Sequence, residues 1–216
     1  MIIAGVEEAG RGPVIGPMVM AICTIDESEE ERLSNIGVKD SKLLTPLKRE
    51  QLFDQVKEIC SYEIIVLSAS EIDDALNDEF MNLNKLEAVT SAKLINSVKM
   101  DKVILDCPSN NIPVYTNYVK EKVNDKNIEV IAEHKADLNH LIVGAASILA
   151  KVTRDRLIEE IKRKIGENFG SGYPSDPLTV SFLRSNWKKH EKIFRKTWAT
   201  YKKVAVNSAQ KGLGEY

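Results

Sequence analysis

Short apolar runs rich in β-branched residues alternate with longer amphipathic stretches along this chain. The apolar runs predict strands at residues 2–6, 18–25, 62–67, 102–106 and 128–132. The amphipathic stretches predict helices at residues 46–59, 70–76, 81–98 and 141–165, the first of them capped by Thr45. An early pair of strands, followed by strands that helices connect, implies a mixed sheet with helices on its faces.

Glycine and proline divide the chain at two places. The segment from Gly10 to Pro17 contains three glycines and two prolines, and it predicts an elaborated connection between the first two strands. Residues 166–174 are also rich in glycine, and short basic helices are predicted beyond them. We therefore expect a core domain over residues 1–170 and a basic helical subdomain with a tail over residues 171–216.

The composition is that of a globular protein. Hydrophobic residues make up 43% of the 216 residues and charged residues 29%, which excludes a disordered or collagen-like chain. The three cysteines are widely spaced without a CxxC pair, which disfavours a zinc site and indicates a reducing, cytoplasmic location. No apolar run approaches the roughly 18 residues of a membrane span, and the N-terminus carries no basic leader, so we expect no signal peptide.

The net charge of −2 hides a strong asymmetry. Residues 1–150 carry 15 basic and 25 acidic side chains, whereas residues 151–216 carry 15 basic and 7 acidic ones. The basic part predicts a polyanionic partner, although solvated helix faces would explain the same charges. The residues expected to form a surface that grips a nucleic-acid duplex are Lys188, Lys189, Lys192, Arg195 and Lys196, with Trp187 and Trp198 between them.

Acidic residues stand at the ends of three predicted strands. Glu7 and Glu8 follow the first apolar run, Asp106 ends the fourth, and Asp137 comes a short turn after the fifth. Carboxylates gathered at one edge of a sheet repel one another unless cations lie between them, so the pattern indicates a site for two Mg²⁺ or Mn²⁺ ions. Ordinary strand-end residues would give the same pattern. Adjacent strand residues also face opposite sides, which makes it difficult for Glu7 and Glu8 to serve together.

A glycine-rich segment, Gly10-Arg11-Gly12, comes directly after the first acids. Because glycine has no Cβ, the backbone there could approach a ligand closely and hydrogen-bond a sugar hydroxyl or a phosphate. A tight turn is the simpler interpretation of a Gly-x-Gly sequence taken alone.

Taken in order along the chain, these segments resemble the type 2 ribonucleases H, specifically archaeal ribonuclease HII. The motifs that carry the resemblance are residues 7–13 (EEAGRGP) with Gly16-Pro17, residues 39–42 (KDSK), Asp106, residues 135–137 (KAD), residues 145–152 (AASILAKV) and residues 170–177 (GSGYPSDP). The resemblance implies an α/β fold, in which a ribonuclease H-like mixed sheet is flanked by helices and followed by a small helical C-terminal subdomain.

The same resemblance implies an endoribonuclease. Such an enzyme hydrolyses the RNA strand of RNA–DNA hybrids and cleaves 5′ of ribonucleotides embedded in duplex DNA by two-metal-ion catalysis, leaving 5′-phosphate ends. The members of the family are often monomers, and we expect a monomer here.

The resemblance also assigns roles to residues. Glu7, Glu8, Asp106 and Asp137 fall on the catalytic, metal-binding positions. Gly10, Arg11 and Gly12 fall on the loop whose backbone reads the ribose 2′-hydroxyl, the group that distinguishes RNA from DNA. Tyr173 falls on the tyrosine that stacks beside the ribose at the RNA-to-DNA junction. Lys42, Ser147 and Lys151 are expected to contact phosphate or to support the acids.

One residue departs from the pattern of the family, whose first acid is aspartate where this chain has Glu7. The extra methylene moves the carboxylate, and a misplacement of about 1 Å can lower a rate around a hundredfold. An alternative function is therefore a catalytically weakened, clamp-recruited protein that binds hybrids. A third hypothesis, a nuclease of the same fold that acts on DNA alone, is disfavoured by the glycine-rich segment.

The C-terminal sequence QKGLGEY has the form Gln-x-x-Leu-x-x-aromatic and resembles the clamp-binding peptide of replication proteins. We expect Gln210, Leu213 and Tyr216 to bind a sliding clamp, with the leucine and the tyrosine as apolar anchors. A frayed terminus is the alternative.

Overall fold

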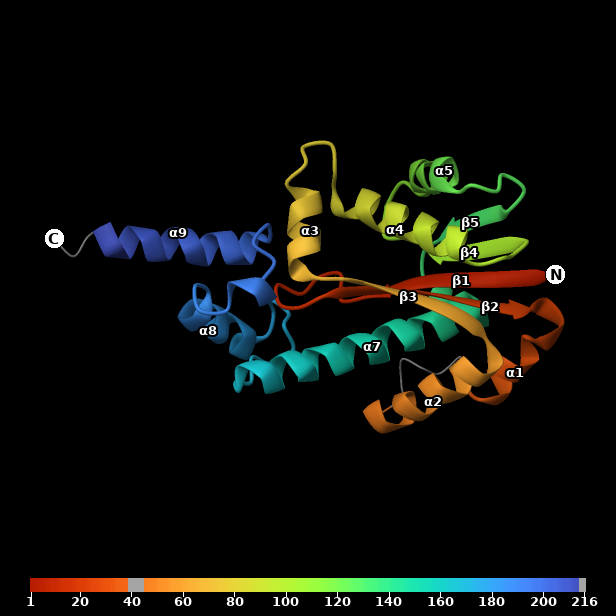
Figure 1. Cartoon of the computed structure of the whole chain (residues 1–216), viewed down its shortest axis with the longest axis horizontal. Helices are drawn as coiled ribbons and strands as arrows, with labels where there is room; N and C mark the ends of the chain where they lie inside the picture. The colour runs from red at the N-terminus through yellow and green to blue at the C-terminus, as the bar shows by residue number, and fades with distance from the viewer. Residues whose placement is uncertain (39–44, 214–216) are drawn as a thin grey trace. The chain divides into compact units, whose positions relative to one another are not determined.

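The structure, a computed structural model, describes residues 1–38 and 45–213 (Figure 1). Lys42 and Tyr216, two of the residues singled out from the sequence, lie outside these ranges. Within the described residues, five strands form one sheet in the order β3-β2-β1-β4-β5. The strands are β1 (Ile2–Ala9), β2 (Met18–Asp26), β3 (Ser61–Leu67), β4 (Lys102–Asp106) and β5 (Glu129–Glu133).

The predicted mixed sheet is confirmed by the strand pairing. Strand β1 runs antiparallel to β2 and parallel to β4, and β4 runs parallel to β5. In the parallel ladders Val6 lies opposite Leu105, and Asp106 lies opposite Glu133. The carboxyl ends of β1, β4 and β5 therefore reach the same edge of the sheet, where a doubly wound sheet commonly carries its site.

Helices occupy most of the remaining described chain. They are α1 (Glu31–Asn35), α2 (Pro46–Ile59), α3 (Ala69–Leu76), α4 (Leu83–Ser97), α5 (Ile112–Lys122), α6 (Ala136–Asn139), α7 (Leu141–Ile165), α8 (Pro177–Asn186) and α9 (Ala199–Leu213), with short 3₁₀ turns η1 (Glu27–Glu29) and η3 (Glu191–Ile193). The start of α2 is as predicted, because the Thr45 hydroxyl accepts a hydrogen bond from the Lys48 N–H at 3.3 Å.

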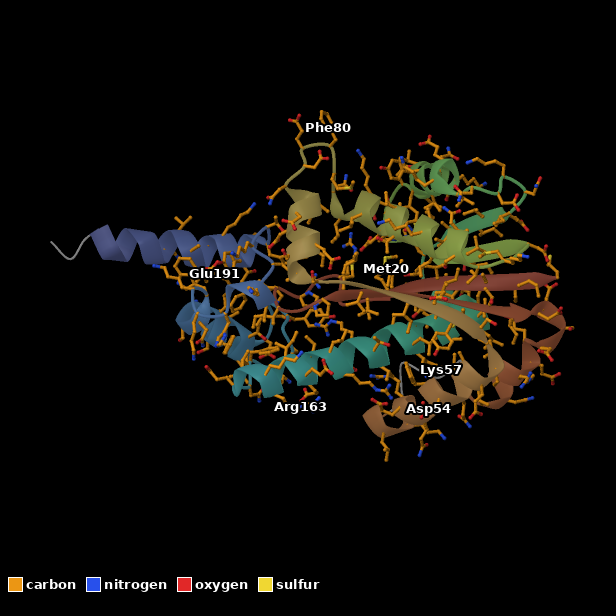
Figure 2. The ribbon with its side chains drawn as sticks, in the orientation of Figure 1. Met20, Asp54, Lys57, Phe80, Arg163 and Glu191 are labelled. Atoms are coloured by element: carbon orange, nitrogen blue, oxygen red, sulfur yellow. The ribbon has the colours of Figure 1, made fainter. Side chains whose placement is uncertain are left out.

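Helix α5 was implied by the alternation of elements, but its bounds were not predicted. Its signals are nonetheless local: the Asn111 side chain accepts a hydrogen bond from the Val114 N–H at 3.2 Å, and Pro113 lies in the first turn. Helix α2 shows the expected amphipathic pattern, with Leu52 and Val56 buried. Asp54 and Lys57, labelled in Figure 2, are exposed residues of the same helix.

The chain divides into two compact units built from interleaved segments. The first comprises Met1–Ala9, Val19–Val66 and Leu83–Arg154, and the second comprises Gly10–Met18, Leu67–Asn82 and Asp155–Tyr216. The division into domains over residues 1–170 and 171–216 stays a prediction.

The first unit contains the sheet. Figure 1 shows α4 and α5 on one side of the sheet and the first part of α7 on the other. Helix α7 packs closely on the sheet at Gly5 of β1, where a Cβ would lie 2.5 Å from main-chain atoms of Ile142 and Val143. Glycine at this position lets the strand and the helix backbone touch.

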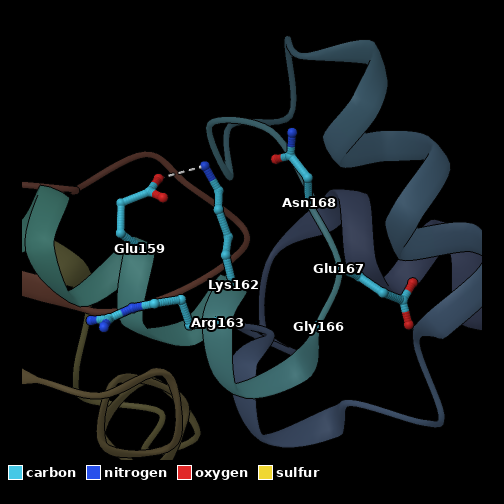
Figure 3. A pocket seen from close by; sticks show the side chains of 6 residues that line it. All are labelled: Glu159, Lys162, Arg163, Gly166, Glu167 and Asn168. Atoms are coloured by element: carbon cyan, nitrogen blue, oxygen red, sulfur yellow. Dashed lines mark hydrogen bonds and ion pairs between the residues drawn. The ribbon is translucent and has the colours of Figure 1, made fainter.

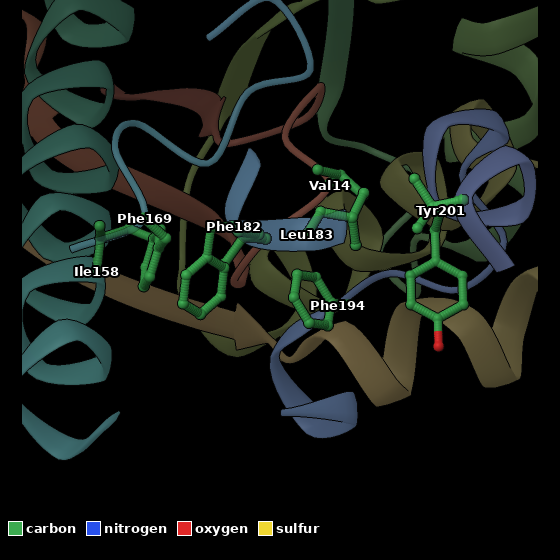
Figure 4. Close-up of a cluster of buried hydrophobic side chains, with 9 residues drawn as sticks. Val14, Ile158, Phe169, Phe182, Leu183, Phe194 and Tyr201 are labelled. Atoms are coloured by element: carbon green, nitrogen blue, oxygen red, sulfur yellow. The ribbon is translucent and has the colours of Figure 1, made fainter. Parts of the chain in front are cut away.

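The second unit has its own apolar core, drawn in Figure 4. Its buried members are Val14, Ile15, Ile158, Phe169, Phe182, Leu183, Phe194, Tyr201 and Val204. The Phe182 ring lies 5.6 Å from that of Phe169 and 6.0 Å from that of Phe194, centroid to centroid. This core joins the glycine-rich segment after β1 to the C-terminal helices, although roughly 180 residues separate them in sequence.

None of the helices in the described part of the chain is both long and apolar enough to cross a membrane.

Candidate active site

The structure brings three of the four predicted acids together in the first unit. Glu7 lies near the end of β1, Asp106 is the last residue of β4, and Asp137 lies in the first turn of α6. Among the described residues, each of these three side chains offers a carboxylate oxygen that lies within 4.8 Å of the other two. Oxygen ligands from three carboxylates suit a hard divalent cation such as Mg²⁺ or Mn²⁺.

Glu8 is not a member of this group in the described part of the chain. Strand β1 continues as far as Ala9, and successive side chains of a strand alternate between its two faces, so Glu7 and Glu8 face opposite ways. The charge of Glu8 still acts on the group, because it adds to the effect of burial in raising the pKa of Glu7. The geometry thus separates two neighbouring acids that the sequence treats alike.

The pKa of Glu7 is strongly raised. Only 8% of the residue is exposed, and burial is the largest cause that raises its pKa, to about 10. The negative charges of Glu8, Asp106 and Asp137 raise it further, and the Lys151 ammonium opposes them. Without a cation, the Glu7 carboxyl therefore keeps its proton at neutral pH.

The surroundings of Glu7 fit a bound cation. Its Oε2 atom is buried, and no group in the described residues donates a hydrogen bond to it. A buried carboxylate oxygen without a donor is costly unless a cation binds it. The alternative of a weakened site therefore finds no support here, because the longer Glu7 side chain still reaches the oxygens of Asp106 and Asp137.

The turn after β5 holds Asp106 in place. The backbone N–H of Ala136 donates a hydrogen bond of 2.7 Å to Asp106 Oδ1. Lys135, just before it, has a left-handed backbone with φ of 60°, which is uncommon for a residue with a Cβ. This turn precedes α6 directly, so one local conformation places both Asp137 and the donor to Asp106.

The nearby histidines have partners that explain their positions. His134 Nδ1 lies 3.0 Å from the Cys107 carbonyl oxygen, to which it donates. His140 Nε2 lies 2.9 Å from Glu133 Oε1. Both contacts hold the imidazole rings against neighbouring residues of the fold.

Two of the residues expected to support the acids lie on α7. Lys151 Nζ donates a hydrogen bond of 2.6 Å to Ser147 Oγ, one helical turn away. The charge of Lys151 lowers the pKa of Glu7, so its ammonium lies near the acidic group. The pair therefore places a positive charge near the acidic group.

The glycine-rich segment and Tyr173 meet in the second unit. A Cβ on Gly12 would lie 3.5 Å from Tyr173 Cε1, so the tyrosine ring lies close to the backbone of the segment, with room for a methyl group between them. The Gly172 carbonyl accepts a hydrogen bond of 2.9 Å from the Val14 N–H, which ties the two loops together. The residues that the resemblance assigned to the ribose are therefore neighbours, and 38% of Tyr173 is exposed.

Asp176 fixes the loop that carries Tyr173, a role that the sequence did not reveal. Its Oδ2 atom accepts hydrogen bonds from the N–H and the hydroxyl of Ser171, at 2.7 and 2.8 Å, and its Oδ1 atom caps α8 through Leu178. The hydrogen bonds from Ser171 are the main cause that lowers the pKa of Asp176. Gly170, with φ of 76°, leaves the space that the carboxylate occupies.

The prediction of a basic surface on the C-terminal part is wrong for one residue. Arg195 was expected on that surface, but it is fully buried, and its guanidinium hydrogen-bonds main-chain carbonyls of the glycine-rich segment. Lys188, Lys189, Lys192 and Lys196 are exposed. Trp187 and Trp198 pack against the core of the second unit.

A hollow at the end of α7 is lined by residues other than those of the predicted site. It has a volume of about 390 Å³ and is lined by Glu159, Lys162, Arg163, Gly166, Glu167 and Asn168 (Figure 3). Lys162 Nζ donates to Glu159 Oε1 at 2.8 Å, and none of the predicted site residues that the structure describes lines the hollow.

The clamp-binding prediction falls partly outside the described residues. Gln210 and Leu213 belong to α9, whose bounds reach Leu213, and Tyr216 lies beyond the described chain.

The site therefore consists of carboxylates gathered at the carboxyl ends of neighbouring strands, in a mixed sheet that helices flank. The sequence model of the family described as Ribonuclease HII matches residues 4–201, and the chain belongs to this family. It is therefore a hydrolytic enzyme, a ribonuclease.

Individual relatives agree with the family. A protein named Ribonuclease HII from Methanococcus maripaludis is 47% identical over 94% of this chain and 87% of its own length. The crystal structure of ribonuclease H2 from Pyrococcus horikoshii is 44% identical and superposes with a TM-score of 0.89, covering 97% of this chain and all of that one. A complex of PCNA with RNase HII from Archaeoglobus fulgidus gives a TM-score of 0.82 at 36% identity, covering 92% of this chain and 95% of that one.

Proposed function

We propose that this ribonuclease hydrolyses the RNA strand of RNA–DNA hybrids and cuts 5′ of single ribonucleotides embedded in duplex DNA, leaving 5′-phosphate ends. The observation that carries the proposal is the group formed by Glu7, Asp106 and Asp137, with a buried Glu7 oxygen that no described residue satisfies. Family membership supports the choice of RNA as substrate.

Glu7, Asp106 and Asp137 would hold two divalent ions, Mg²⁺ or Mn²⁺, with Glu8 contributing from the neighbouring position of β1. When bound, such ions stabilise the negative charge that builds up on the attacking and leaving oxygens of a phosphoryl transfer. The carboxylates supply the opposing charge, and the Ala136 N–H keeps Asp106 from rotating. Lys151, oriented by Ser147, binds the phosphate and offsets part of its charge, and Lys42 is proposed as a second phosphate contact.

Recognition of the ribose is assigned to Gly10, Arg11, Gly12 and Tyr173. The contact between Gly12 and the tyrosine ring supports this assignment, because a methyl group at residue 12 would occupy space beside the ring. The 2′-hydroxyl both donates and accepts hydrogen bonds, so main-chain groups can distinguish it from a hydrogen atom without contacting the base.

We also propose that Gln210, Leu213 and Tyr216 bind a sliding clamp. The support is the sequence form of the tail together with the Archaeoglobus relative, which was solved as a complex with PCNA. Removal of residues 208–216 should abolish clamp binding and leave cleavage of a short duplex unchanged. Equal clamp affinity of the full and shortened chains would reject this part of the proposal.

The main test is cleavage of an end-labelled DNA duplex containing one ribonucleotide, in Mg²⁺ and separately in Mn²⁺. We expect one cut, 5′ of the ribonucleotide, and none in an otherwise identical all-DNA duplex. A uniform RNA–DNA hybrid measures the second activity, and Asp106→Asn serves as the inactive control.

Each other result has a definite meaning. Binding of the ribonucleotide duplex without cleavage in either metal would favour the hybrid-binding alternative. Cleavage of the all-DNA duplex at a comparable rate would favour a DNA nuclease.

A further inference from the structure

The buried guanidinium of Arg195 contacts the glycine-rich segment at several points. Its Nη2 atom donates to the Gly10 carbonyl at 2.6 Å and its Nη1 atom to the Arg11 carbonyl at 2.9 Å. Its Nε atom donates to the Gly16 carbonyl at 3.0 Å. One side chain therefore fixes carbonyls at both ends of the connection between β1 and β2, and none of its surface is exposed.

Trp198 completes the set of contacts. Its indole N–H donates to the Gly12 carbonyl at 3.0 Å, and its ring lies 4.7 Å from Arg195 Cζ, in the range of a cation–π contact. The carbonyls of the successive residues 10, 11 and 12 are thus all hydrogen-bonded by two side chains that stack on each other.

Main-chain contacts fix the register between the two segments. The Arg195 N–H donates to the Val14 carbonyl at 2.9 Å, and the Gly16 N–H donates to the Ile193 carbonyl at 2.8 Å. Ile15 and Phe194 form a single antiparallel bridge between them. Residues 193–195 therefore pair with residues 14–16 in antiparallel register.

The glycine-rich segment needs such support. Gly10 and Gly16 have φ values of 81° and 86°, which glycine adopts freely, and glycine also has the most alternative conformations to lose. A buried charge is retained only where hydrogen bonds compensate it, and the planar guanidinium presents its donors in a fixed fork. That fork holds several carbonyls in fixed relative directions, whereas a lysine ammonium presents its donors on a flexible side chain without a fixed plane.

We propose that Arg195, assisted by Trp198, is a positioning residue that sets the preference of this enzyme for ribose over deoxyribose. By orienting the carbonyls of residues 10–12, it fixes how their peptide groups face the sugar that enters beside Tyr173. This inference rests on the proposed function, since it assumes that the glycine-rich segment contacts the 2′-hydroxyl.

The test compares the affinities for two duplexes that differ only in one 2′-hydroxyl. Dissociation constants for the single-ribonucleotide duplex and the all-DNA duplex are measured by fluorescence anisotropy, with Asp106→Asn present in every variant to prevent cleavage. The affinity ratio of the two duplexes is the readout, because loss of folded protein lowers both affinities equally and leaves the ratio unchanged.

In Arg195→Lys we expect the ratio to fall about tenfold, the effect of losing well-formed charged hydrogen bonds, while affinity for the all-DNA duplex stays within about twofold. Trp198→Phe keeps an aromatic ring and loses the donor to Gly12, so its ratio should fall less, by about threefold. Phe182→Leu is the matched control: it weakens the same apolar core and should lower the melting temperature without changing the ratio.

An unchanged ratio in Arg195→Lys and Trp198→Phe would overturn the inference and leave the proposed function intact. If Arg195→Lys does not fold, an unchanged ratio in Trp198→Phe is by itself enough to overturn the inference. If the Asp106→Asn enzyme itself binds the two duplexes equally, recognition of ribose by this protein is disproved, and the inference with it.

Discussion

The Asp106 carboxylate accepts a 2.7 Å hydrogen bond from the backbone N–H of Ala136. This bond ties the end of β4 to the turn after β5, and the left-handed backbone of Lys135 immediately precedes the donor. Asp106 therefore has two separable functions: one oxygen anchors the turn, and the negative charge belongs to the group with Glu7 and Asp137.

Substitutions of Asp106 should separate these two functions. Asp106→Asn keeps a carbonyl oxygen that can accept from Ala136, so the melting temperature should stay at or above that of the wild type. Cleavage should fall by more than about a hundredfold, because a cation loses a charged ligand. Asp106→Ala should lose both activity and stability. Equal destabilisation by the two substitutions, in thermal unfolding without metal, would contradict this assignment.

The charge of the Glu7 side chain should matter more for cleavage than its length. Glu7→Gln removes the charge and should reduce cleavage by more than about a hundredfold, because a cation loses a charged ligand. Glu7→Asp keeps the charge and shortens the side chain, and we expect activity within about tenfold of the wild type, with the metal shifting to meet the carboxylate. Steady-state rates across a series of Mg²⁺ and Mn²⁺ concentrations measure both. If Glu7→Asp is as inactive as Glu7→Gln, side-chain length rather than charge decides.

Metal binding should release a proton from Glu7. The folded, metal-free protein holds this proton because burial raises the pKa of the carboxyl from 4.5 to about 10, and a bound cation requires the ionised form. Affinity for Mn²⁺ should therefore rise with pH between these values, by up to about tenfold per pH unit. Isothermal titration calorimetry in two buffers of different ionisation enthalpy gives the number of protons released. A value near zero at pH 7 would show that Glu7 is already ionised.

The same shift predicts how the stability of the metal-free protein depends on pH. Between the two pKa values the folded state binds a proton that the unfolded chain has lost, so the contribution of Glu7 to stability is full below 4.5 and declines as pH rises toward 10. Glu7→Gln has no such proton. The difference between the melting temperature of Glu7→Gln and that of the wild type should therefore increase in favour of Glu7→Gln as pH rises, when both are measured with a chelator present.

Lys151 should act on substrate more than on metal. Lys151→Met removes the ammonium near Glu7, so Mn²⁺ should bind at least as tightly while the KM for the duplex rises by about tenfold through loss of a phosphate contact. Lys162→Met, further along α7, removes an ammonium that bonds to Glu159 instead and is the matched control. Weaker Mn²⁺ binding with an unchanged KM would reverse the assignment.

Gly12→Ala should impair recognition without unfolding the protein. The new Cβ would lie 3.5 Å from Tyr173 Cε1, which is ordinary van der Waals contact, so the melting temperature should be nearly unchanged. Cleavage at an embedded ribonucleotide should fall by about a hundredfold, because the methyl group displaces the sugar from its position beside the ring. Gly166→Ala is the complementary control: its φ of 72° makes alanine strained, so stability should fall and cleavage should persist.

The sequence predicted those parts of the fold that depend on local patterns. The cap at Thr45 and the apolar run ending at Asp106 located α2 and β4 within a residue or two, because hydrogen-bonding caps and side-chain periodicity act over a few residues. Helix α5 also carried a local signal in Asn111 and Pro113, and only its bounds were left open.

The sequence predicted that acids at strand ends would lie together, and the structure was needed to show which of them do. Asp106 ends β4 and Asp137 lies shortly after β5. These two strands are parallel neighbours, which brings the two acids together. The position of Glu8 could not be predicted in the same way. If β1 continues past Glu8, its side chain lies on the opposite face of the sheet from Glu7, and β1 does continue to Ala9. That end point depends on pairing with β2, which brings Glu8 opposite Met20.

By itself, the sequence determined the order of elements, the family and the acids that could bind a metal, since these rest on residue type and short spacing. The tertiary structure alone decided that Arg195 lies inside the protein and binds the carbonyls of Gly10, Arg11 and Gly16, although its charge predicted a surface position. The physical reason is that a buried guanidinium needs hydrogen-bond acceptors for its N–H groups, and here main-chain carbonyls converge on it. That convergence is produced by packing between segments roughly 180 residues apart, which no local pattern records.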